Sequence, residues 1–306
     1  RGLGDVYKRQ EIYMNNKYQL QWFPGHMAKT RRMIQDNLKL VDVVIELVDA
    51  RLPLSSRNPD VDKIIGSKPR IVVLNKADIA DNSLTMKWLN YFKDKNIEAI
   101  SANSQTGKGL KKELDNAIEI VLTDKFKRDE TKGIQRHAVK MMVIGIPNVG
   151  KSSFINRLSG RAAAKTGDRP GITQTKQWIR IAGKYELLDT PGILWPKFEN
   201  VDDAKKIAFT GGIKDEILDV EDLAYELLGY LKESYIDSLI KTYNLNDSDS
   251  ELNKYELLES IGRKRGCVIS GGEVDTFRTA NIIISDFRSA KLGRITLEEP
   301  KRNEEN

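Results

Sequence analysis

One eight-residue stretch constrains the fold of this chain more than any other feature. Residues 145–152 read GIPNVGKS, a glycine followed by four variable residues and then Gly-Lys-Ser. An apolar run, AVKMMVIG, leads into it, and residues 151–159 can continue as a helix. A strand, a glycine-rich turn and a helix N-terminus in this order surround a phosphate with backbone N–H groups. The stretch therefore predicts a phosphate-binding loop (P-loop) at the edge of an α/β sheet.

The polar side chains of this loop have predicted roles. Lys151 is expected to neutralise the β- and γ-phosphates, and Ser152 to be a ligand of Mg²⁺. Further nucleotide contacts are expected from Asn148, Val149, Gly150 and Ser153. The alternative is a chance match, which the strand pattern before the loop and the helix pattern after it disfavour.

Two downstream segments complete a phosphate and magnesium site. Asp189 and Gly192 begin and end the tetrapeptide DTPG, which follows the strand pattern KYELL. We expect Asp189 to hold Mg²⁺ through water and the Gly192 N–H to approach the γ-phosphate. Thr173, in PGITQT, is the candidate for the switch threonine that completes the Mg²⁺ shell, with Thr175 as its rival. An ordinary turn is the other reading of this segment.

A second motif indicates which base the nucleotide carries. The tetrapeptide NKAD ends in Asp78, which can accept hydrogen bonds from N1–H and the exocyclic amine of guanine. Adenine lacks both donors, so ATP would leave a carboxylate unpaired. Asn75 is expected to bind the other edge of the base or the P-loop, and Lys76 to lay its stem along the base. Backbone N–H groups for guanine O6 are expected from Ser101, Ala102 and Asn103.

The order of these motifs is unusual, because NKAD and SAN precede the P-loop instead of following it. Such a rotated set indicates a circularly permuted GTPase. The chain resembles the ribosome biogenesis GTPase A family. The motifs that carry the resemblance are QWFPGHMAK (21–29), DARLPLSSRNP (49–59), GIPNVGKSS (145–153) and DFRSAKLGRITLE (286–298).

The resemblance implies an activity and a partner. It implies hydrolysis of GTP to GDP and phosphate, with Mg²⁺ as cofactor, and assembly of the large ribosomal subunit. The protein would bind ribosomal RNA in the GTP state and leave after ribosome-stimulated hydrolysis. Two alternatives stay open: a permuted GTPase that acts on another RNA or a membrane-associated partner, and a non-enzymatic RNA-binding scaffold with a vestigial nucleotide site.

Periodicity predicts the architecture. Apolar strand patterns alternate with helix patterns over residues 38–190, which is typical of a mostly parallel sheet with helices on both faces. After Pro196 the pattern is helical, with one stripe through Leu223 and Leu227 and another through Phe277 and Ile284. The expected segments are a non-native or disordered start (1–16), a permuted P-loop GTPase domain (17–197), an all-helical RNA- or ribosome-binding domain (198–298) and a disordered tail (299–306). Within the GTPase domain, residues 123–137 are expected to be a linker.

Composition excludes some classes of protein. Cys267 is the only cysteine, so an intramolecular disulfide and a multi-cysteine metal site are excluded. No apolar run approaches the ~18 residues of a membrane span. We therefore expect a cytoplasmic protein without stable membrane association. The net charge of +6 favours a polyanionic partner, though only mildly.

Hydrolysis needs a group that positions water, and the usual glutamine after D-x-x-G is replaced by Ile193. The resemblance points to His26, in QWFPGHMAK, as the catalytic residue; the alternative is a capping or packing histidine. The other histidine, His137, lies in the expected linker and is interpreted as solvated. Asn148 resembles the asparagine of potassium-activated GTPases, so K⁺ is a possible second cofactor.

The last helix pattern carries a polar stripe beside its apolar one. The candidate RNA contacts are Arg278, Arg288, Lys291 and Arg294. Such side chains suit the phosphate backbone of folded RNA, which proteins recognise mostly by shape. A solvated helix face is the alternative.

Overall fold

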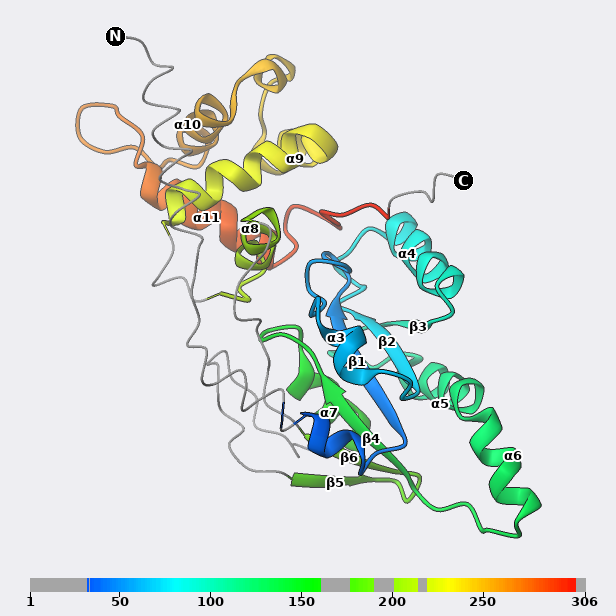
Figure 1. Cartoon of the computed structure of the whole chain (residues 1–306). Coiled ribbons are helices and arrows are strands. Elements are labelled where there is room, and N and C mark those ends of the chain that lie inside the picture. The colour runs from blue at the N-terminus through cyan, green and yellow to red at the C-terminus, as the bar shows by residue number, and fades with distance from the viewer. Residues whose placement is uncertain (1–31, 33, 161–176, 190–200, 214–218, 301–306) are drawn as a thin grey trace. The chain divides into compact units, whose positions relative to one another are not determined.

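The apolar runs of the first 190 residues form one six-stranded sheet (Figure 1). The computed structural model describes residues 32, 34–160, 177–189, 201–213 and 219–300. The strands are β1 (Val43–Asp49), β2 (Arg70–Asn75), β3 (Glu98–Ala102), β4 (Val139–Ile144), β5 (Gln177–Ile181) and β6 (Tyr185–Asp189). Their order is β3-β2-β1-β4-β6-β5, and every neighbouring pair is parallel except β5 with β6.

Helices cover this sheet because both of its faces are apolar. The helices of this part of the chain are α3 (Val61–Ile65), α4 (Asn82–Asp94), α5 (Leu110–Val121), α7 (Lys151–Ser159) and α6 (Thr123–Thr131), which buries no residue against the sheet. On one face, Val44 packs with α3 and the helical residues 34–38, and Val72 packs with α4. Side chains on the opposite face of the same strands, such as Ile45 and Val73, are fully buried as well. The mostly parallel α/β sheet expected from the sequence is confirmed.

The expected linker at 123–137 is partly wrong, because its first nine residues form α6 (Figure 1). No residue of α6 is buried, so the sequence carries no apolar stripe that could reveal the helix. Charged contacts hold it instead. Lys125 lies 3.3 Å from Asp129 one turn away, and the guanidinium of Arg136 lies 4.0 Å from the ring centre of Phe126.

The carboxyl ends of β1, β2, β3, β4 and β6 all meet one edge of the sheet, because these strands run parallel. The NKAD motif begins at the end of β2, SAN at the end of β3, and the P-loop follows β4. Asp189 is the last residue of β6. A rotated chain order therefore still brings the motifs to one edge, where ligands of open α/β sheets bind.

The described residues divide into two compact units. Residues up to 189 and residues 298–300 form the first, called the sheet unit, and residues 201–297 form the second, called the helical unit. The helical unit contains α8 (Val201–Phe209), α9 (Val220–Tyr243), a 3₁₀ helix η2 (Asp247–Glu251), α10 (Lys254–Lys264) and α11 (Thr276–Arg288). Among the described helices, none is both long and apolar enough to cross a bilayer.

The helical unit packs around α9, which contacts α8, α10 and α11. Leu223 and Leu227 of α9 are buried as the stripe predicted, and so is Ile284 of α11. Phe277 differs, because 60% of its surface is exposed. It lies in the first turn of α11, at the end of the stripe, and its expected place in the core is wrong.

The chain returns to the sheet unit after the helical unit. The carboxylate of Glu298 accepts hydrogen bonds from the N–H groups of Leu54 (2.8 Å) and Ser55 (3.2 Å) and from the Ser55 hydroxyl. The Trp88 indole N–H donates to the Glu298 carbonyl at 3.0 Å. Glu298 thus anchors the C-terminal segment to the loop that follows β1.

Candidate nucleotide-binding site

Asn75 joins the two halves of the candidate site. Its side-chain N–H donates to the carbonyl of Val149 in the P-loop at 2.7 Å. Its side-chain oxygen accepts from the backbone N–H (3.2 Å) and hydroxyl (2.6 Å) of Ser104, directly after SAN. Asn75 is only 2% exposed, so its amide is committed to these partners. NKAD, SAN and the P-loop are therefore assembled at one place.

The glycines of the P-loop are required by close approaches. A Cβ on Gly145 would lie 2.5 Å from the carbonyl oxygen of Leu47 in β1. A Cβ on Gly150 would lie 2.5 Å from the Asn75 amide nitrogen, and its φ of +93° is strained for any other residue. Only glycine fits at either position. The loop backbone can consequently wrap closely against its neighbours.

Lys151 points back across this loop. Its ammonium donates to the carbonyls of Gly145 (3.0 Å) and Ile146 (2.7 Å). Ser152 and Ser153 follow in the first turn of α7 and are half-buried. Positive charge, backbone N–H groups and a hydroxyl are thus concentrated at one helix N-terminus, an arrangement suited to an anion.

The donor set fits a hard cation beside that anion. The backbone brings Ser152, at the start of α7, and Asp189, at the end of β6, to the same edge, since β4 and β6 are parallel neighbours. Hydroxyl and carboxylate oxygens are ligands that Mg²⁺ prefers. The position of Asp189 is described for its backbone only.

The base half presents an open carboxylate. Asp78 is exposed, whereas Ala102 is buried and its carbonyl accepts the Ala77 N–H at 3.1 Å. Asn103 uses its side-chain oxygen within its own loop, accepting from the N–H groups of Gln105 (2.9 Å) and Thr106 (3.0 Å). Its side chain therefore shapes the loop. Ser101 is half-buried at the end of β3.

Three polar residues near the site were not predicted: Asp49, Arg51 and Ser104. The carboxylate of Asp49, the last residue of β1, lies 3.0 Å from the Lys76 ammonium and 2.8 Å from Nη2 of Arg51. Burial favours a raised pKa for Asp49, but the charges of Arg51 and Lys76 outweigh it and hold the pKa well below its usual range. Two features of the sequence could have indicated these residues: Asp49 ends a predicted strand, and Ser104 directly follows SAN.

Relatives of known family share almost the whole length of this chain. A family model described as "50S ribosome-binding GTPase" matches residues 140–261. Ribosome biogenesis GTPase A of Bacillus cereus is 50% identical over 282 residues, covering 92% of this chain and 94% of the relative. The protein of that name from Thermotoga maritima is 32% identical over 92% of this chain and 95% of its own. The chain belongs to the ribosome biogenesis GTPase A family.

Solved structures agree with this assignment. GDP-bound YlqF of T. maritima has a TM-score of 0.62 at 28% identity, covering 88% of this chain and 99% of its own. The GNP-bound form has a TM-score of 0.61 at 28% identity, covering 89% and 99%. As a member of the ribosome biogenesis GTPase A family with a circularly permuted P-loop domain, the protein is a GTP hydrolase.

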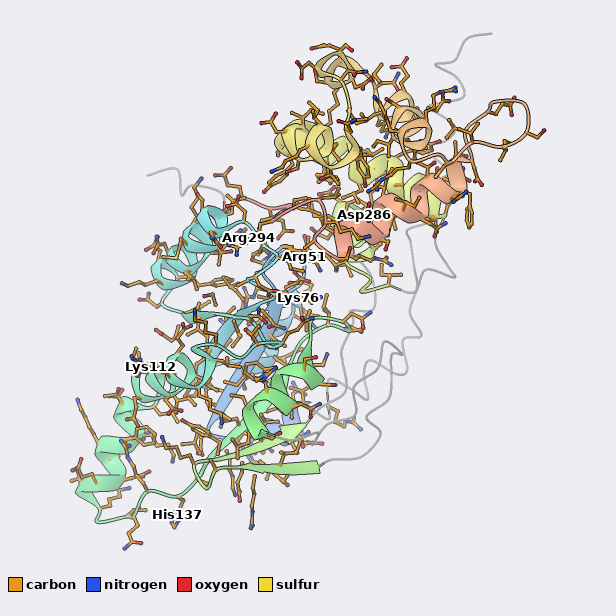
Figure 2. The ribbon with its side chains drawn as sticks, turned by 180° about the vertical axis from the view of Figure 1, so that it is seen from behind. Arg51, Lys76, Lys112, His137, Asp286 and Arg294 are labelled. Atoms are coloured by element: carbon orange, nitrogen blue, oxygen red, sulfur yellow. The ribbon has the colours of Figure 1, made fainter. Side chains whose placement is uncertain are left out.

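Several predicted residues of this GTPase lie outside the described part of the chain. They are His26, Thr173, Thr175, Gly192 and Ile193. His137 is described, and it lies at the opposite end of the sheet unit from Lys76 (Figure 2). His137 is therefore remote from the nucleotide site.

The candidate RNA contacts differ in what their side chains already bind. The Arg288 guanidinium donates to the carbonyls of Ala208 (2.9 Å) and Phe209 (3.0 Å) at the end of α8. The Lys291 ammonium pairs with the buried carboxylate of Asp286 at 2.9 Å. Arg278 and Arg294 are exposed. The structure thus gives Arg288 a packing role that the stripe pattern did not predict.

Proposed function

We propose that this GTPase is an assembly factor for the large ribosomal subunit. It binds precursor particles through ribosomal RNA in the GTP state, and ribosome-stimulated hydrolysis releases it. The observation that carries the nucleotide part is the bridge from Asn75 to Val149 and Ser104, which joins the base and phosphate motifs. The partner is supported by the names of the relatives, ribosome biogenesis GTPase A, and by the family model of a 50S ribosome-binding GTPase.

In this proposal each half of the site has one task. Asp78 accepts the two guanine N–H donors, and Lys76 covers the base with its stem. Lys151 and the P-loop N–H groups neutralise the phosphates, which requires the ammonium to turn from its present loop carbonyls. Ser152, Thr173 and, through water, Asp189 would hold Mg²⁺, which would supply positive charge against the charge that develops on the phosphates during hydrolysis.

Water positioning falls to His26 in this scheme, because Ile193 can neither donate nor accept a hydrogen bond. Replacing His26 with alanine is expected to abolish subunit-stimulated hydrolysis while GTP affinity stays near normal. A single-turnover assay with large subunits measures this effect. An unchanged stimulated rate would exclude His26 as the catalytic residue.

K⁺ is proposed as a second cation, held with the help of Asn148. This residue is exposed in the P-loop with a left-handed φ of +60°. A monovalent ion there would spread positive charge over the phosphates, as an arginine finger does in other GTPases. Faster turnover in KCl than in NaCl at equal ionic strength is the expected result, and equal rates would contradict it.

The RNA contacts are assigned to Arg278, Lys291 and Arg294 of the helical unit. Their exposed positive charges suit phosphate oxygens, and such binding weakens steeply with salt. Co-sedimentation with precursor particles should therefore depend on both the GTP analogue and the salt concentration. A partner other than ribosomal RNA would leave the protein in the supernatant under all these conditions.

The decisive experiment compares GTP turnover alone, with mature large subunits and with their precursors. Stimulation by these particles, and not by small subunits, is expected. Intrinsic hydrolysis that no ribosomal particle changes would leave the GTPase assignment intact but refute its proposed target.

A further inference from the structure

A buried charge cluster joins Asp49, Arg51 and Lys76. Arg51 and Lys76 lie close together in Figure 2. Within the described part of the chain, the Asp49 carboxylate accepts four hydrogen bonds or ion pairs. Arg51 supplies three of them: its N–H (3.0 Å) and Nε (2.9 Å) reach Oδ1, and Nη2 reaches Oδ2 at 2.8 Å. The fourth comes from the Lys76 ammonium, 3.0 Å from Oδ2. Asp49 therefore links the loop after β1 with the lysine of NKAD.

The cluster is shielded from solvent on the β1 side. Asp49 is 1% exposed and Arg51 is 2% exposed, whereas the Lys76 side chain is 25% exposed. A bidentate arginine holds a carboxylate in one orientation, because the two N–H groups form a rigid fork. Oδ2 of that carboxylate, which accepts from Nη2 of Arg51, also faces the more accessible ammonium of Lys76.

The backbone fixes both partners of the contact. Asp49 pairs with Asn75 in the β1–β2 register, and the Ala50 N–H donates to the Asn75 carbonyl at 2.8 Å. The Asp49 N–H donates to the Ser56 hydroxyl at 3.0 Å. Lys76 has a left-handed φ of +61° directly after Asn75. The two residues therefore start from neighbouring strand ends.

We propose that Asp49 is a positioning residue of the guanine site. It fixes the ammonium of Lys76, so that the aliphatic stem presents a preorganised surface to the base, and Arg51 orients Asp49. This gives the beginning of the DARLPLSSRNP segment a task in nucleotide binding. The inference rests on the base-binding role of Lys76 in the proposed function.

The same strand offers a matched control. Glu46 is also a buried β1 carboxylate, 2% exposed, and it is also held by arginine, with Arg57 Nε at 2.9 Å. Its second arginine, Arg70, lies 3.5 Å away. Among the described residues, its ionic partners are Arg57 and Arg70, which lie outside NKAD, SAN and the P-loop. Loss of charge at Glu46 therefore tests burial and arginine pairing without the link to Lys76.

The experiment measures GDP affinity and GTP turnover for Asp49→Asn, Glu46→Gln, Lys76→Ala and the double variant Asp49→Asn/Lys76→Ala. Losing a preorganised long side chain corresponds to a roughly 3- to 10-fold weaker affinity for Asp49→Asn. KM for GTP should rise similarly with kcat unchanged, because the base is bound equally in ground and transition states. The double variant should bind GDP no more weakly than Lys76→Ala alone.

Two outcomes overturn the inference: an affinity loss in Asp49→Asn no larger than in Glu46→Gln, or additive losses in the double variant. If Lys76→Ala binds GDP normally, the base-site role in the proposed function fails instead. Asp49→Asn strands part of the Arg51 charge, which can prevent folding. Asp49→Asn/Arg51→Gln removes both charges, and it should reproduce the same KM increase with an unchanged kcat.

Discussion

The two units use their charged side chains in different ways. At the carboxyl edge of the sheet unit, polar groups that are far apart in sequence meet, as the Asn75 amide, the Ser104 hydroxyl and the Val149 carbonyl do. In the helical unit, much of the charge binds the unit itself. Asp286 is 2% exposed and pairs with Arg265 at 3.0 Å as well as with Lys291. A charged residue at a strand end is thus better evidence of a ligand site than one on a helix face.

This difference follows from geometry. Parallel strands place their carboxyl ends at one edge, so a motif at a strand end has a defined location. A helix surface offers many equivalent positions, and a basic residue there can serve a neighbouring helix end or a buried acid as well as a partner. The following experiments test whether the two units keep these separate tasks.

The largest effect is expected for Lys151→Ala in the sheet unit. Removing the phosphate-site ammonium should lower kcat for GTP hydrolysis by about 10²–10³, the usual effect of losing one preorganised charge-stabilising group. Turnover with large subunits measures it. Lys112→Ala, an exposed lysine on α5, is the control and should behave as wild type. If Lys151→Ala and Lys112→Ala hydrolysed GTP at the same rate, Lys151 would not be a phosphate-binding residue.

Asp78→Asn should change the base that is bound. The amide cannot accept both guanine N–H groups, so GTP affinity should fall about 10- to 100-fold, as for a lost charged hydrogen bond. Xanthosine triphosphate, which carries an oxygen in place of the exocyclic amine, should gain affinity. Asp78→Ala is the control, with weakened GTP binding and no gain for xanthosine. If Asp78→Asn kept the wild-type preference for GTP over xanthosine triphosphate, Asp78 would not be the residue that recognises the guanine base.

In the helical unit, Arg288→Ala should affect stability and leave GDP affinity unchanged. It removes the donors to the Ala208 and Phe209 carbonyls, at a cost of about 1–3 kcal/mol of unfolding free energy. Hydrogen exchange of α8 measures this local loss. Arg278→Ala, which removes an exposed arginine from the same helix, should leave α8 protected. Identical protection in both variants would contradict the packing role.

The same contrast explains what the sequence could predict. Asn75, Lys151 and Asp78 belong to spaced motifs whose strand context could be identified, and the sheet followed from apolar runs. Asp49 and Arg51 were missed because the contact of Asp49 with Lys76 joins two residues at neighbouring strand ends that are 27 positions apart, and Arg51 takes part only through Asp49. Helix α6 was missed because it buries no residue, and Phe277 was misplaced because packing ends at the first turn of α11.

Acid should weaken the helical unit through Glu226 of α9. Partial burial raises its pKa, but hydrogen bonds from Lys205 and Lys254 (2.6 and 2.5 Å) outweigh this and lower it. Because the pKa of Glu226 is lower in the folded state than in the unfolded state, its ionised carboxylate stabilises the fold above about pH 4.3, the unperturbed glutamate value. This stabilisation is lost as the pH falls through the folded-state pKa. Denaturation between pH 3 and 6 should show a shallower acid slope for Glu226→Gln. An unchanged slope would mean that the contacts do not stabilise the charge.

The smallest effects are expected from the two exposed arginines, Arg278→Gln and Arg294→Gln. Each should weaken binding to precursor particles in the GTP state, and a lost phosphate contact lowers the salt slope of log K by about 1. Neither should change α8 protection or GDP affinity, which separates them from Arg288. Arg128→Gln, an exposed arginine of the sheet unit on α6, is the charge-matched control. If Arg128→Gln shifts the slope as much as the helical-unit variants, net charge rather than a defined RNA surface governs the interaction, and the division of tasks between the two units fails.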